Sequence, residues 1–189
     1  MYVNICFAQL FTILMFKRYL LLFIIAFSSL SGETYNHFNG EITYYGYHIL
    51  HDWKGVSSNI GGFIEFKKNT NEFECELKVP IQSFDSKNGN RDANMLIYTN
   101  ALEHPDIKFT SNSITFNGKK ATLDGLLYFG GVKKKISSEV DVDLSQNLKF
   151  SGQLLIKLSD FNIKRPALLF RKIDDEIKIN FQIEAIKGK

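Results

Sequence analysis

The sequence is poor in cysteine and proline, and neither sign of charge dominates it. Its 189 residues include 2 cysteines and 3 prolines, with 23 basic and 20 acidic side chains. One pair of cysteines cannot supply the disulfide framework of a small secreted domain, so the fold has to rest on a hydrophobic core. The nearly balanced charge argues against the strongly basic surface that is typical of nucleic-acid-binding proteins.

The motifs of common enzyme classes are also missing. The sequence has no G-x-S-x-G nucleophile turn, no H-E-x-x-H zinc motif and no glycine-rich phosphate loop. His48 and His51 are three positions apart in a predicted strand, so their side chains are expected on opposite faces unless the chain turns at Leu50. We therefore predict neither catalysis nor a metal site.

The first 31 residues are predicted to be a signal peptide. Lys17 and Arg18 precede the apolar run 19–27, and small residues follow near Ser31, which is the order found in secretory leaders. The run is too short for a membrane span, which needs about 20 residues. Met15 is an alternative start, and retention of the leader as an anchor is the alternative to cleavage.

Residues 32–189 are predicted to form one secreted domain. Loss of Lys17 and Arg18 with the leader would leave 21 basic and 20 acidic side chains. Cys75 alternates with acidic neighbours, which indicates a buried, inward-facing thiol. No membrane span after cleavage and no nucleic-acid partner are expected, and association into a homodimer is compatible with the sequence.

Apolar and polar residues alternate with period two through most of this domain. Such alternation is typical of β-strands with one buried face, and Asn117-Gly118 is a strong hairpin signal. Because no helix of ordinary length separates the strands, we predict an all-β antiparallel sheet that closes into an eight-stranded barrel and so hides its edges. A two-sheet sandwich is the alternative. The predicted strands are residues 41–50, 59–68, 72–80, 106–116, 119–129, 134–144, 147–158 and 175–186.

Two segments interrupt the alternation. Residues 92–102 tolerate a helix, which Asn90 or Asp92 could cap and which Pro105 would prevent from extending further. Residues 160–171 are irregular and are predicted to form a lid or a bulge. We expect the short helix to lie across a barrel opening.

Several short motifs follow one another in a fixed order along the domain. They are SFDS at Ser83, RD at Arg91, HPDIKF at His104, DGLL at Asp124 and GVKK at Gly131. This order resembles the YceI-like family over about residues 48–185. The resemblance implies a lipocalin-like barrel in the periplasm that binds a polyisoprenoid lipid.

The inward-facing positions carry no charge, so they suit an apolar chain better than a polar substrate. The resemblance implies the tail of a polyisoprenoid or an isoprenoid quinone as the ligand, and no other cofactor is expected. A structural or interaction module with a solid barrel core is the alternative. The predicted lumen lining is Ile64, Phe66, Phe73, Leu77, Ile107, Phe109, Phe116, Leu127, Val140, Val142, Leu154, Ile156, Ile179 and Phe181.

Arg91 and Asp92 are predicted to contact the lipid head group at the barrel mouth. In the structural alternative, Asp92 caps the helix and Arg91 pairs with a carboxylate such as Asp85. Trp53 is the only tryptophan, and we interpret it as a plug of one barrel end, with a place in the ligand mouth as the alternative. The run Lys133–Lys135 is interpreted as a solvated edge that prevents strand addition, with head-group contact as its alternative.

Overall fold

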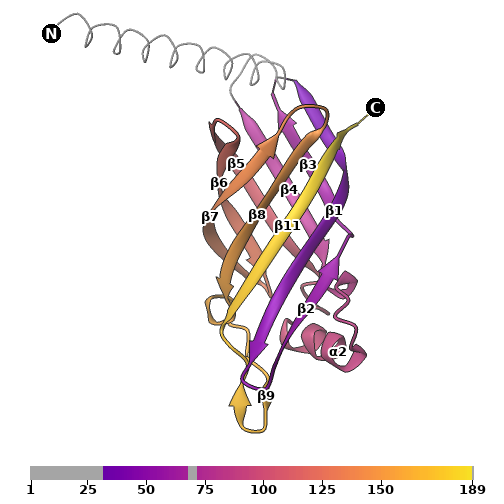
Figure 1. Ribbon diagram of the computed structural model, residues 1–189, viewed down its shortest axis with the longest axis vertical. Coiled ribbons are helices and arrows are strands. Elements are labelled where there is room, and N and C mark those ends of the chain that lie inside the picture. Colours follow the sequence, from indigo (N-terminus) through magenta and orange to yellow (C-terminus); the bar gives the residue numbers. More distant parts are fainter. Residues whose placement is uncertain (1–31, 68–71, 189) are drawn as a thin grey trace, which may run out of the picture.

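The computed structural model describes residues 32–67 and 72–188, so the predicted signal peptide lies outside the described residues. Nine strands form one antiparallel sheet in the order β11-β8-β7-β6-β5-β4-β3-β1-β2, and β11 also pairs with β1, which closes the sheet (Figure 1). The strands are β1 (Glu33–His48), β2 (His51–Ser57), β3 (Gly61–Phe66), β4 (Phe73–Pro80), β5 (Asp106–Asn117), β6 (Lys120–Phe129), β7 (Val132–Asp143), β8 (Leu148–Lys157) and β11 (Glu176–Lys187).

The predicted eight-stranded antiparallel barrel is confirmed. β3 pairs with the beginning of β1 and β2 with its end, so these two short strands share one position in the ring. β1 starts well before the predicted residue 41, and β2 was not predicted as a strand at all. Both stretches are rich in polar residues, and their strand structure comes from backbone pairing with β11 and with each other.

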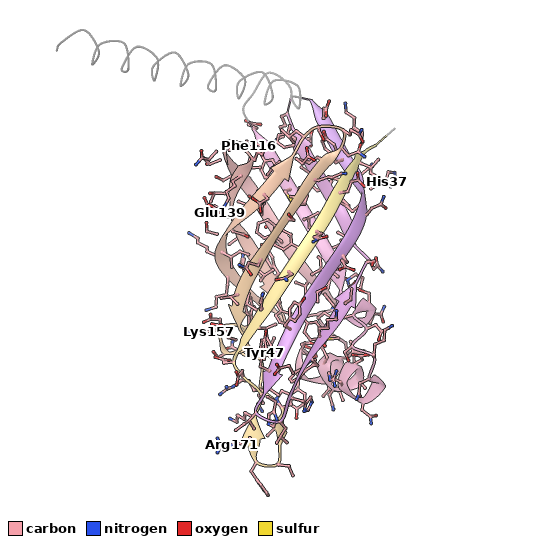
Figure 2. All side chains as sticks on the ribbon, viewed as in Figure 1. His37, Tyr47, Phe116, Glu139, Lys157 and Arg171 are labelled. Carbon is pink, nitrogen blue, oxygen red and sulfur yellow. The ribbon has the colours of Figure 1, made fainter. Side chains whose placement is uncertain are left out.

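One end of the barrel is filled with side chains. We call it the filled end, and it lies around the start of β1, where Figure 2 labels Phe116. Cys75 is buried there, as predicted, and burial raises the pKa of its thiol to about 12, with a smaller contribution from Glu76. A neutral, enclosed thiol is a poor nucleophile. The buried residues that define the filled end are Tyr35, Ile64, Phe66, Phe73, Cys75, Ala121 and Leu148.

The short elements gather at the opposite end, which we call the mouth (Figure 1). They are the 3-10 turns η1 (Ile81–Ser83) and η2 (Leu158–Phe161), the helix α2 (Gly89–Tyr98), and a small hairpin of β9 (Ala167–Leu168) and β10 (Arg171–Lys172). The irregular segment predicted as a lid or bulge is therefore mostly η2 and this hairpin. No helix within residues 32–67 and 72–188 is long and apolar enough to cross a membrane.

The start of α2 differs from the prediction. Asn88 is the N-cap, and its side-chain oxygen accepts a hydrogen bond from the backbone N–H of Arg91 at 3.0 Å. Asn90 and Asp92 both lie inside the helix, so neither is the cap. Asn88 is preferred because it is the last residue with an extended backbone, which an N-cap requires.

Candidate functional site

A cavity of about 500 Å³ occupies the half of the barrel next to the mouth. We call this the mouth half. Its volume lies within the range of about 300–1,000 Å³ that is usual for small-molecule sites. Nine of the predicted lumen residues line this cavity: Leu77, Ile107, Phe109, Leu127, Val140, Leu154, Ile156, Ile179 and Phe181. Their contact with a ligand stays a prediction.

The other predicted lumen residues do not line the cavity. They belong to the cluster around the filled end, where they pack against one another; the rings of Phe66 and Phe73, for instance, have centroids 5.3 Å apart. Strand alternation predicts the face of a residue but not its depth along the barrel axis, which is why these were grouped with the rest. They are Ile64, Phe66, Phe73, Phe116 and Val142.

Several lining residues were missed by the sequence prediction. Ile136 and Ser138 continue the alternation of Val140 towards the mouth, so the pattern of β7 could have revealed them. Ile42 and Tyr44 lie on β1, a strand with five phenylalanine and tyrosine residues and no clear alternation. Burial raises the pKa of Tyr44, so its hydroxyl is neutral at physiological pH and adds no charge to the cavity.

Glycines let aromatic rings lie flat against the wall of this cavity. The ring of Phe181 covers Gly152, where an added Cβ would come within 2.8 Å of Cζ. Phe109 covers Gly125 in the same way, and Trp53 covers Gly46, its direct partner in the β1–β2 pair. These contacts hold large apolar surfaces against the strands and leave the centre of the mouth half open.

Most polar side chains of the lining gather at the cavity mouth, and Ser138 on β7 and Tyr44 on β1 lie deeper. The guanidinium carbon of Arg91 lies 5.4 Å from the centre of the Trp53 ring, and both residues line the cavity. The interpretation of Trp53 as a plug is therefore wrong, and its alternative place at the mouth is the one observed. Asn88, Asn94 and Thr99 add further polar groups from α2 and its two caps.

Neither contact of the structural alternative for Arg91 and Asp92 is observed, although both residues have structural partners. The carboxylate of Asp85 pairs with Lys87 at 2.6 Å, whereas Arg91 donates to the backbone carbonyl of Ser86 at 3.3 Å. Asp92 accepts from the Ser86 N–H at 3.2 and 3.3 Å and is outside the cavity lining. Asp92 thus holds the loop before α2, and Arg91 is the residue of this pair that reaches the cavity.

His48 and His51 come together, contrary to the expectation for a continuous strand. The chain turns at Ile49–Leu50, the two histidines become direct partners, and their ring centroids lie 6.1 Å apart at the cavity mouth. The N–H of Leu50 donates to Nδ1 of His48, which leaves Nε2 to donate to the carbonyl of Arg171 at 3.3 Å. Within the described part of the chain, no group of three or more metal-ligating side chains occurs.

The basic run after the β6–β7 turn stays on the outside. Lys134 and Lys135 are exposed on β7, and Nζ of Lys133 lies 5.4 Å from the centre of the Tyr128 ring. None of the three lines the cavity. Their positions fit a solvated strand edge.

Comparison with known proteins identifies the family of this chain. The profile of the YceI-like domain matches residues 32–185. The chain belongs to the YceI-like family. Protein YceI of Escherichia coli O157:H7 is 25% identical over 161 residues, which cover 80% of this chain and 81% of that protein.

Solved structures share the barrel of this YceI-like protein at low sequence identity. BcnA of Burkholderia cenocepacia superposes with a TM-score of 0.68 at 20% identity, covering 78% of this chain and 96% of BcnA. A polyisoprenoid binding domain from Saccharophagus degradans gives a TM-score of 0.65 at 12% identity, with 84% of this chain and all of that domain covered. These likenesses support the fold.

Proposed function

We propose that this protein binds one long apolar lipid in the mouth half of its barrel, outside the cytoplasm, and catalyses no reaction on it. The observation that carries this proposal is the open apolar cavity of about 500 Å³. The isoprenoid chain of a polyisoprenoid or a quinone fits this chemistry, and the polyisoprenoid binding domain of Saccharophagus degradans has the same fold. The position of the signal-peptide-like leader favours the periplasm or secretion.

The energetics allow useful affinity without any specific polar contact. Each buried methylene contributes about 0.8 kcal/mol, so about ten of them give roughly 8 kcal/mol before ordering costs. Micromolar binding corresponds to about 8 kcal/mol. A longer prenyl chain still reaches this binding free energy after the cost of ordering the chain is subtracted. Selectivity would then come from the length and shape of the cavity.

The head group is proposed to lie beside Arg91. A guanidinium presents several N–H donors in a fixed plane, which suits a phosphate or a quinone oxygen. Stacking on Trp53 restricts this side chain and leaves it facing the cavity. Asp92 has no part in this contact because its carboxylate is engaged with the Ser86 backbone.

Organic extraction of the purified protein, followed by mass spectrometry, tests the proposal. The wild type should release a prenyl-type lipid, whereas Phe109→Asp should release little, because it places a charge in the apolar wall. Leu155→Asp is the matched control, since Leu155 lies on β8 with 57% of its surface exposed and alternates with the lining residues Leu154 and Ile156. This control should retain the lipid.

Two results would contradict lipid binding. One is a clean extract from folded wild-type protein that also fails to take up added polyprenol. The other is full lipid retention by folded Phe109→Asp. Either would favour the structural or interaction module instead.

A further inference from the structure

The hairpin beside the cavity mouth ends in two exposed apolar residues. Leu169 is 71% exposed and Phe170 is 104% exposed. Both have positive φ, 49° and 66°, a backbone region that bulky residues rarely occupy. Two-residue hairpin turns of this kind normally use Asn-Gly or similar pairs. Strained backbone conformations of this type cluster at functional segments. The strain therefore indicates a binding role for the Leu169-Phe170 turn.

A second apolar turn lies next to the first. Ile49 and Leu50, which connect β1 to β2, are 72% and 58% exposed. The two turns are held together because His48 Nε2 donates to the Arg171 carbonyl at 3.3 Å and the Asp174 N–H donates to the Tyr47 carbonyl at 2.9 Å. We call Ile49, Leu50, Leu169 and Phe170 the mouth tip. Figure 1 shows the β9–β10 hairpin projecting beyond the barrel at this end.

Positive charge surrounds the end of the hairpin. The segment 164–172 reads KRPALLFRK, with four basic residues and no acidic one. Lys164, Arg171 and Lys172 are exposed. Figure 2 labels Arg171 near the far end of the molecule.

Most acidic groups of this region lie at the base of the hairpin, and the exposed Asp52 follows Leu50 by two residues on β2. Asp175 follows β10, accepts from Ser159 on η2, and lies 3.9 Å from Arg165. Asp160 belongs to η2 itself, and Asp174 bonds through its backbone to the end of β1. Leu169 and Phe170 are therefore flanked by cations, and Asp160 and Asp175 lie behind these cations, nearer the barrel.

We propose that the mouth tip docks on an anionic lipid bilayer, with Leu169 and Phe170 entering the interface and the flanking cations facing the head groups. An exposed apolar edge bordered by Lys and Arg is the composition that binds membrane interfaces. The tip is a projection rather than a groove, so it suits a deformable surface. Docking would bring the cavity mouth to the bilayer surface, where a lipid could enter the cavity. The entry of a lipid rests on the function proposed above.

Flotation with vesicles of phosphatidylcholine, with and without phosphatidylglycerol, measures the docking. The wild type should bind the anionic vesicles, more weakly at high salt, and bind the neutral ones poorly. Phe170→Ser should lower the affinity by about tenfold, the value expected for one large apolar side chain. Lys172→Glu should lower it by roughly thirtyfold on anionic vesicles alone, because two units of charge change near the surface.

Matched controls lie away from the mouth. Leu155→Ser removes an exposed leucine from the outer wall of β8, and Lys119→Glu reverses an exposed charge at the β5–β6 turn. Both should bind as the wild type does. All variants carry the same N-terminus, so any contribution from the leader cancels in the comparison.

The docking proposal is overturned if wild-type protein ignores anionic vesicles, or if Phe170→Ser binds as well as Leu155→Ser. A Phe170-dependent dimer in sedimentation without vesicle binding would also overturn it and assign the tip to a second copy of the chain. Lipid extraction from the same preparations separates the two proposals. Loss of docking with lipid retained refutes only the docking, and docking with a clean extract refutes only the lipid cavity.

Discussion

The filled end and the mouth half of the barrel are built from the same long strands but are packed differently. On β4, Phe73 and Cys75 are buried among side chains, whereas Leu77 and Val79 line the cavity. On β8, Leu148 belongs to the filled end, and Leu154 and Ile156 belong to the cavity wall. Moving along one strand therefore changes the role of an inward apolar residue from packing to lining.

This contrast indicates that one end of the barrel supplies stability and the other end supplies the cavity. Side chains that face a void lose part of the dispersion contacts that a dense core provides. Dense packing around Phe66 and Phe73 is expected to supply much of the stability, so that the mouth half can keep an unfilled interior. The β1–β11 pair, which closes the barrel, runs through both halves.

The largest expected difference is between two phenylalanine-to-alanine variants. Phe66→Ala, at the filled end, should lower the free energy of unfolding by about 3–5 kcal/mol, the usual cost of emptying a packed aromatic site. Phe181→Ala, in the cavity wall, should cost clearly less, because part of its ring already faces open space. Chemical denaturation measures both. Equal losses would show that the two halves are packed alike.

Enlarging a leucine tests the same contrast in the opposite direction. Leu148→Trp has no room at the filled end and should lower the free energy of unfolding by about 1–3 kcal/mol. Leu154→Trp, on the same strand, can extend into the cavity, so it should cost less and should reduce the amount of extractable lipid. Denaturation and lipid extraction on both variants provide the check. A Leu154→Trp protein that is destabilised as much as Leu148→Trp would contradict an accessible void.

The barrel could be predicted from the sequence because burial of one strand face imposes period two on the chain. The prediction worked best where alternation is strict, as in β4 and β11. It failed for the beginning of β1, where Asn39, Gly40 and Glu41 give no alternation and pairing with β11 decides the structure. Such pairing joins residues more than a hundred positions apart, which no local pattern records.

The site was harder to predict than the fold. Alternation placed Phe66 and Phe109 on the same inner surface but could not tell that the first packs and the second lines a cavity. The turn at Ile49–Leu50 has no glycine, asparagine or proline, so the sequence offered a turn at Leu50 only as the alternative to a continuous strand. The position of the Leu169-Phe170 turn could not be predicted for the same reason, because both turns expose apolar residues where polar ones are usual.

The smallest expected effect concerns a hydrogen bond at the mouth. The Ser159 hydroxyl donates to the carboxylate of Asp175 at 2.5 Å, and this bond is the main reason that the pKa of Asp175 lies below its usual value. A lowered pKa in the folded state stabilises the protein above the usual aspartate pKa of about 3.9, and this contribution disappears as the pH falls through the folded value. Because the pair is at the surface, its contribution should be well below about 1 kcal/mol.

Ser159→Ala should raise the pKa of Asp175 towards its usual value, measured by NMR titration of the carboxyl group, and should make unfolding less dependent on pH in the acid range. Asn147→Ala is the control from the filled end, since Asn147 donates to Glu184 at 2.9 Å and is the main cause of the lowered pKa of that residue. It should shift Glu184 and leave Asp175 unchanged. An Asp175 pKa that does not move in Ser159→Ala would mean that the backbone N–H of Ser159, at 2.9 Å, together with Arg165, 3.9 Å away, holds the carboxylate. The hydroxyl would then not be what ties η2 to the start of β11.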